Sequence, residues 1–187
     1  MNRLSPQEVI QSLQSVLPQK DFIALHEPIF QGKETMYVTD CIHTGWVSSV
    51  GAYVDQFEQN LAEFTGVKKA VAVVNGTAAL HICLKLIGVK TNDEVLIPSL
   101  TFVATANAVT YTGAITHFVD VSEKTLGMDP YKLEAYLAKH TFFKNNEIFS
   151  KKSGRRISAM VPMHTFGHPV EMDKLLDVAQ TFHLKVV

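Results

Sequence analysis

Short apolar runs alternate with longer amphipathic stretches through the second half of the chain. Strand-like runs occupy five segments: 70–74, 94–98, 115–121, 157–162 and 184–187. Helix-like stretches follow the first four of them: 77–88, 101–113, 129–140 and 171–183. This alternation predicts βα units, and therefore an α/β fold of three layers, α/β/α, with a mostly parallel sheet covered by helices on both faces.

Three helices are predicted before this alternation begins. Ser5-Pro6-Gln7-Glu8 has the pattern of a capping box, and Pro18 should end the helix that it starts. A second helix is expected within 32–45, closed by Gly45, after an extended segment at 22–30. The stretch 52–66 is amphipathic, with an apolar face ending at Gly66, which suits a C-terminal cap. That face is formed by Val54, Phe57, Leu61 and Phe64.

The segment 141–156 interrupts the alternation, because it is long, polar and cationic toward its end. We expect a surface excursion or a small hairpin. Its four basic residues are open to two interpretations, a solvated loop or contact with a phosphorylated or nucleotide-bearing ligand. They are Lys151, Lys152, Arg155 and Arg156.

Composition narrows the function classes. The 187 residues are 47% hydrophobic and carry a formal net charge of −1, without a basic block that would favour nucleic acid. The N-terminus is too polar for a signal peptide, and no apolar stretch approaches the roughly 20 residues of a membrane span. Cys41 and Cys83 match no metal-binding spacing, and we expect Cys83 to be a buried free thiol. We therefore expect a soluble, cytoplasmic protein.

The junction Asn75-Gly76-Thr77 joins a predicted strand directly to a predicted helix. The first turn of a helix has unpaired N–H donors and a partial positive charge, and Gly76 lets a ligand approach the backbone. The Thr77 hydroxyl can cap the helix or bond to an anion. This arrangement favours a phosphate site, although many such turns bind nothing.

Two common phosphate motifs are absent from this junction. A dinucleotide fingerprint needs three glycines as G-x-G-x-x-G, and a P-loop needs G-x-x-x-x-G-K-[ST]. A phosphate held here would therefore belong to a smaller ligand than a dinucleotide or a magnesium-bound nucleoside triphosphate.

The next strand–helix junction adds an aromatic residue. Phe102 follows the run 94–98 and could stack on a planar ring held by the first junction, or could simply fill the core. His164 and His168 are four residues apart, but Gly167 and Pro169 disfavour a shared helical face, so we expect no metal pair.

Taken together, three segments resemble the DegT/StrS-type aminotransferases. They are GWVSSVGAYVDQFEQNLAEFTGVKKAVAVVNGTAALHICL, IPSLTFVATANAVTYTGAITHFVDV and VPMHTFGHP. The resemblance runs from about Ala24 to Val187. The segments HEPIF, GWVSSVG and VNGTAALH are similar to those of one branch of the family. Enzymes of this branch aminate a UDP-linked 4-keto-6-deoxy-N-acetylhexosamine in surface glycan and nonulosonic acid pathways.

The resemblance implies pyridoxal 5'-phosphate as cofactor, the type I fold of enzymes that use it, and a homodimer with active sites at its interface. Gly76, Thr77 and Ala78 would bind the cofactor phosphate, and Phe102 would stack on its ring. Asn107 and His164 lie in matching motifs near the cofactor. Packing or capping within its helix is the alternative for Asn107, and a hydrogen-bonded strand-end histidine for His164. The substrate-lining segment would contribute Trp46, Ser48 and Ser49.

The resemblance also implies a division of the chain. Residues 1–50 would form N-terminal helices and the segment lining the active site, and residues 51–187 would form the N-terminal part of an incomplete large, cofactor-binding domain. The family's Schiff-base lysine and pyridine-binding acid would both fall beyond Val187. Neither Lys85 nor Lys185 stands in a matching context, so no catalytic residue is expected within these residues.

We therefore expect a parent enzyme that transfers an amino group from an amino acid, typically glutamate, to a nucleotide-linked keto sugar. The isolated chain would be inactive and prone to aggregate. A sugar dehydratase on the same scaffold and a non-catalytic remnant are the alternatives.

Overall fold

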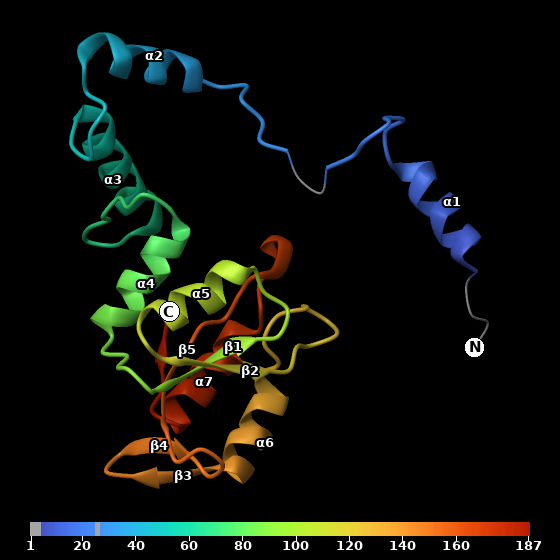
Figure 1. Ribbon diagram of the computed structural model, residues 1–187, viewed down its shortest axis with the longest axis vertical. Helices are drawn as coiled ribbons and strands as arrows, with labels where there is room; N and C mark the ends of the chain where they lie inside the picture. The colour runs from blue at the N-terminus through green and yellow to red at the C-terminus, as the bar shows by residue number, and fades with distance from the viewer. Residues whose placement is uncertain (1–4, 25–26) are drawn as a thin grey trace. The chain divides into compact units, whose positions relative to one another are not determined.

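The computed structural model describes residues 5–24 and 27–187 (Figure 1). The chain divides into two compact units, Met1–Ala70 and Val71–Val187, which are treated separately below. Residues 25 and 26 lie outside the described residues. They belong to the extended segment expected at 22–30, and residue 26 is the first residue of the segment HEPIF.

The first unit contains the three predicted helices, α1 (Pro6–Val16), α2 (Glu34–Thr44) and α3 (Ala52–Thr65). The capping box of α1 is present, because Ser5 Oγ accepts from the Glu8 amide at 3.2 Å and the Glu8 carboxylate accepts from the Ser5 amide. Gly45 and Gly66 close α2 and α3 in the left-handed conformation, with φ of 75° and 73°. The sequence pattern therefore predicted the start of α1 and the C-terminal ends of α2 and α3.

The apolar face predicted for α3 is not buried. Phe57 is 54% exposed and Phe64 is 89% exposed, and none of the residues in α1, α2 or α3 is buried. Amphipathic spacing defines a face that favours burial, but another surface has to cover it. These three helices thus present uncovered apolar faces.

The second unit is built on a six-stranded sheet. Its strands are β1 (Glu94–Pro98), β2 (Ile115–Val119), β3 (Thr141–Lys144), β4 (Glu147–Ser150), β5 (Arg156–Met160) and β6 (Lys185–Val186). Its helices are α4 (Gly76–Leu86), α5 (Val103–Tyr111), α6 (Pro130–His140), α7 (Met172–Thr181) and the 3₁₀ turn η1 (Thr165–Gly167). Strands β2, β1, β5 and β6 run parallel, which confirms the mostly parallel sheet.

The two faces of the sheet carry separate cores. Val95 and Ile97 of β1 pack with α4 and α5, whereas Leu96 between them packs with α6 and α7. Successive side chains of a strand point to opposite faces, so one buried strand supplies both cores. Helices thus cover both faces, and the predicted α/β/α architecture is confirmed.

The segment 141–156 forms the predicted hairpin. Strands β3 and β4 pair in antiparallel fashion, and β4 continues the sheet beside the first half of β5. Asn145 and Asn146 form the turn with φ of 51° and 65°, a conformation that asparagine tolerates better than most residues. Lys151, Lys152 and Arg155 are exposed, as the solvated-loop interpretation expects.

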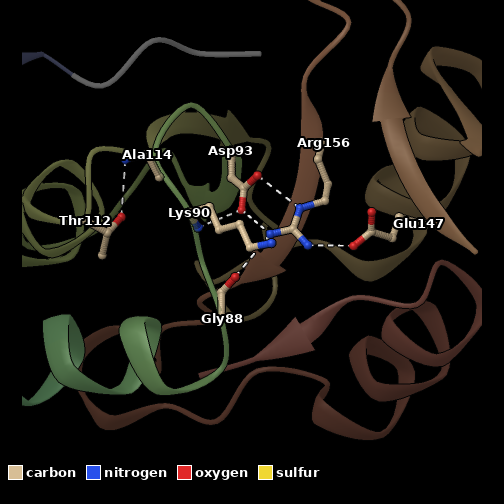
Figure 2. A network of polar contacts seen from close by, with 7 residues as sticks. All are labelled: Gly88, Lys90, Asp93, Thr112, Ala114, Glu147 and Arg156. Atoms are coloured by element: carbon tan, nitrogen blue, oxygen red, sulfur yellow. Dashed lines mark hydrogen bonds and ion pairs between the residues drawn. The ribbon is translucent and has the colours of Figure 1, made fainter. Parts of the chain in front are cut away.

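Arg156 does not belong to the solvated loop. It begins β5, and its side chain is only 19% exposed. Its guanidinium donates to both carboxylate oxygens of Asp93, to Glu147 and to the carbonyl of Gly88 (Figure 2). Its charge is therefore used within the fold, which the sequence alone did not indicate.

Two further expectations are wrong. Residues 70–74 form no strand in this structure, and Val71 and Val74 are 71% and 89% exposed. An apolar run becomes a strand only where a neighbouring strand offers a regular hydrogen-bond ladder.

Cys83 is exposed rather than buried, because it lies on the side of α4 that faces away from the sheet core, where Ile82 and Leu86 are also exposed.

Candidate functional site

Helix α4 begins at the glycine junction, and Asn75 is its N-cap. The Asn75 side-chain oxygen accepts from the Ala78 amide at 2.9 Å, and its backbone oxygen accepts from the Ala79 amide at 3.1 Å. Within residues 5–24 and 27–187, no acceptor is hydrogen-bonded to the amide of Gly76 or Thr77. Two donors at the start of α4 thus stay available to a ligand, while the Ala78 amide is already occupied.

The space and charge at this helix start also suit an anion. A Cβ atom built on Gly76 would meet no other atom within 4 Å. Among the α-helices of the described residues, only α4 and α5 have no acidic residue at the N-cap or in the first turn. The partial positive charge of both helix starts is therefore not offset by a neighbouring carboxylate.

The two helix starts lie at the same edge of the sheet. Helices α4 and α5 pack against each other, and both run back from the edge at which β1 ends. Phe102 is the N-cap residue of α5 and is 69% exposed. The alternative in which Phe102 fills the core is wrong, and its ring is free to contact a ligand at this edge.

The loop after β5 lies against the loop after β1. Thr101 Oγ1 is 3.0 Å from the Met163 sulfur and 2.9 Å from Thr105 Oγ1. Thr101 precedes Phe102 and Met163 precedes His164, so the structure brings the segments of these two predicted site residues together.

His164 is exposed and precedes the 3₁₀ turn η1. Its Nδ1 accepts from the Val170 amide at 3.2 Å. A nitrogen that accepts carries no proton, so the neutral ring carries its proton on Nε2. His164 is thus hydrogen-bonded within its loop, as the structural alternative expected, and still offers an N–H donor. No cluster of three potential metal ligands occurs in the part of the chain that the structure describes.

Asn107 is half-buried in the middle of α5, five residues after the N-cap. Its position excludes a capping role at the start of the helix. No hydrogen bond within the described ranges involves its side-chain amide.

The three predicted substrate-lining residues belong to the first unit. Trp46, Ser48 and Ser49 are exposed in the connection between α2 and α3. Trp46 and Ser48 border a hollow of about 400 Å³, where the Trp46 ring lies close to Gly51. Tyr53 also lines this hollow, and its hydroxyl donates to Asp40 at 2.9 Å, which raises the Tyr53 pKa.

Sequence reasoning missed the role of Asn75 and Thr101. An asparagine directly before a helical pattern is a recognisable cap signal and could have identified Asn75. Thr101 contacts Met163, which lies 62 positions further along the sequence, and no local pattern predicts such a contact.

The second unit is thus an α/β domain. At one edge of its sheet it has an exposed aromatic ring and two helix starts whose partial positive charge no acidic residue offsets. Residues 28–187 match the model of the DegT/DnrJ/EryC1/StrS aminotransferase family. The chain belongs to this family.

Similar proteins point the same way. The chain is 39% identical over 165 residues to a GDP-perosamine synthase of Caulobacter vibrioides, covering 88% of this chain and 40% of that protein. It is also 39% identical to the spore coat polysaccharide biosynthesis protein SpsC of Bacillus subtilis, covering 89% of this chain and 38% of the relative. The chain thus spans about two fifths of the length of the curated relatives it matches.

Solved structures confirm the fold class. NtdA from Bacillus subtilis, with bound cofactor PMP, superposes with a TM-score of 0.69 at 26% identity, over 90% of this chain and 37% of that one. The predicted resemblance to the family and its fold is therefore confirmed. No helix among the described residues is long and apolar enough to cross a membrane.

Proposed function

We propose that this chain supplies the phosphate- and ring-binding part of a pyridoxal-phosphate-dependent aminotransferase that acts on a nucleotide-linked keto sugar. The observation that carries the proposal is the start of α4, where the Gly76 and Thr77 amides are unpaired beside open space. Family membership and the PMP bound to a structural neighbour support it.

The residues present fit this cofactor. Unpaired amides at a helix start suit a phosphate, and the uncovered Phe102 ring suits the face of a pyridine. We propose that the Ala78 contact is made by its side chain, because Asn75 occupies its amide. Asn107 and the Nε2 donor of His164 complete the proposed set. When bound, pyridoxal phosphate would supply a ring that acts as an electron sink for the carbon that carries the amino group.

No lysine of this chain is proposed to form the imine. Lys85 lies in the last turn of α4, nine residues after Gly76 and hence about 14 Å along the helix axis from the phosphate turn. Lys185 is exposed within β6. We propose that residues 51–187 hold the cofactor, and that Trp46, Ser48 and Ser49 of the segment 1–50 contact the sugar substrate.

The finer points of the proposal concern substrate and assembly. We propose glutamate as amino donor, a UDP-linked 4-keto-6-deoxy sugar as acceptor, a homodimer in the cytoplasm, and a role in surface glycan biosynthesis. The name of SpsC supports the last point, whereas the GDP-perosamine synthase makes a GDP-linked sugar the alternative for the nucleotide.

A chimeric enzyme tests this proposal directly. Residues 28–187 would replace the aligned segment of the Caulobacter vibrioides GDP-perosamine synthase, and a second chimera would use SpsC as host. We expect the purified chimeras to retain pyridoxal phosphate and to aminate a nucleotide-linked 4-keto-6-deoxy sugar with glutamate as donor.

Each outcome of the chimera assay bears on a different part of the proposal. Soluble, folded chimeras without bound cofactor would contradict the phosphate site. Chimeras that hold the cofactor but aminate only the GDP-linked sugar would contradict the proposed nucleotide alone. The unmodified hosts, assayed in parallel, set the reference rate for each sugar.

A further inference from the structure

A second cluster of titratable side chains lies away from the proposed cofactor site. Glu94 begins β1, His117 lies in β2 and Tyr136 lies in α6. His117 Nδ1 is 2.6 Å from a Glu94 carboxylate oxygen, and His117 Nε2 is 3.0 Å from the Tyr136 hydroxyl. The three side chains thus form one continuous hydrogen-bonded series.

The carboxylate at the inner end of this series is firmly held. Glu94 is 6% exposed, and its second carboxylate oxygen accepts from Ser153 Oγ. The side chain of His117 is 15% exposed, and its ring meets the Tyr136 ring edge-on at 5.5 Å. Because the carboxylate accepts from Nδ1–H, the neutral imidazole presents the Nε2 lone pair to the tyrosine hydroxyl.

The three side chains are arranged like the groups that activate a nucleophile in an enzyme. A hydroxyl is hydrogen-bonded to a base, and the base is oriented by a buried carboxylate. The outer end of the series is open, since Tyr136 is 38% exposed. We propose that Tyr136 is a nucleophilic tyrosine that accepts an acyl group from an activated acyl donor, with His117 as its base and Glu94 as positioning residue.

A hollow beside Tyr136 can admit such a donor. It measures about 320 Å³, and its lining includes Phe118, Leu133 and Lys132. Val119 and Leu133, which belong to the core on the α6 side of the sheet, supply apolar atoms to its lining. Lys132 precedes Tyr136 by one helical turn, and its ammonium group donates to Asp120, which also lines the hollow.

The proposed step balances as follows. The Tyr136 oxygen forms a bond to the carbonyl carbon of the donor, and the bond from that carbon to the leaving group breaks. The phenolic proton moves to His117 Nε2 and then to the leaving group. The products are an aryl ester on Tyr136 and the protonated leaving group, and no oxidant or cofactor is needed.

The 187-residue chain carries its own control for this proposal. Tyr131 lies on the same helix and is more exposed, at 57%, but its hydroxyl makes no hydrogen bond within the described residues. Treatment with N-acetylimidazole, followed by peptide mass spectrometry over time, gives the acetylation rate of each tyrosine. We expect Tyr136 to react at least about tenfold faster than Tyr131, since general bases contribute about 10²–10⁴-fold.

Variants separate activation from local structure. His117→Gln should lower the Tyr136 rate to that of Tyr131, and Glu94→Gln should lower it partly, with the Tyr131 rate unchanged in both. Equal or slower acetylation of Tyr136 in the unmodified chain would overturn the proposal without any variant. A folded His117→Gln protein, checked by circular dichroism, that retains the fast Tyr136 rate would overturn it as well.

Discussion

Arg156 shows how one side chain joins distant parts of the second unit. Its guanidinium contacts Asp93 before β1, Glu147 in β4 and the Gly88 carbonyl after α4. The hydrogen bonds to Asp93 are the largest cause of the raised Arg156 pKa, which lies above its already high ordinary value. The guanidinium therefore stays charged across the ordinary pH range.

Replacing Arg156 should destabilise the fold. Arg156→Met leaves the Asp93 carboxylate, whose side chain is 9% exposed, without its cation. Breaking a fully buried pair costs roughly 3–5 kcal/mol, and the partial exposure of Arg156 reduces our expectation to about 2–3 kcal/mol of unfolding free energy. Urea denaturation followed by circular dichroism measures this loss.

Glu147 offers the matched control, because its side chain is 47% exposed. Glu147→Gln should cost less than about 1 kcal/mol, as exposed ion pairs do. Equal losses of unfolding free energy in the two variants would contradict the larger contribution that we assign to the contact between Arg156 and Asp93.

At the scale of elements, local patterns predicted most of the second unit. The strand Glu94–Pro98 agrees with its apolar run residue for residue, and Asp129-Pro130 marks the start of α6 with a cap and a first-turn proline. These signals lie within a few residues of each other, so a sequence reader can use them. For the segment 141–156 the sequence left two expectations open, a surface excursion or a small hairpin, and the structure shows the hairpin.

Contacts between elements were not predictable in the same way. The register that places His117 opposite Leu96, within reach of Glu94, depends on how β1 and β2 align. The run 70–74 has strand composition but no strand structure, because strand formation depends on a partner elsewhere. The candidate site shares this limit: the glycine junction was visible in the sequence, whereas the Thr101–Met163 contact was not.

An ion pair between elements gives the protein a predicted pH dependence. Lys132 of α6 donates to Asp120 after β2 at 2.8 Å, and this hydrogen bond, with a second from the Val121 amide, lowers the Asp120 pKa below its ordinary value of 3.8. A carboxyl whose folded pKa is lowered stabilises the fold above the unfolded pKa, and this contribution disappears as pH falls through the folded pKa.

Asp120→Asn should therefore be less stable than the unmodified chain at pH 6, and the difference should shrink as pH falls below 3.8. Urea denaturation at a series of pH values measures it. In a Lys132→Met background the same substitution should have a smaller effect. A difference that is independent of pH, or unaffected by Lys132→Met, would contradict this account of the pair.

At the scale of the whole molecule, uncovered apolar surface is the dominant feature. Helices α1 to α3 bury none of their residues, and Leu86 on α4 is 80% exposed. Such surface favours association with another protein surface. The proposed homodimer would provide one, and it would also bring a second copy of every site residue into the assembly.

The central claim is that the first amides of α4 bind the phosphate of a small cofactor. Amide NMR of the ¹⁵N-labelled chain, titrated with pyridoxal phosphate and separately with pyridoxal, measures this at the two residues concerned. We predict that the Gly76 and Thr77 resonances shift with pyridoxal phosphate and not with pyridoxal, and that Gly76→Val, which fills the open space, abolishes the shift at Thr77. Unchanged Gly76 and Thr77 resonances at saturating pyridoxal phosphate, or equal shifts with pyridoxal, would contradict the account.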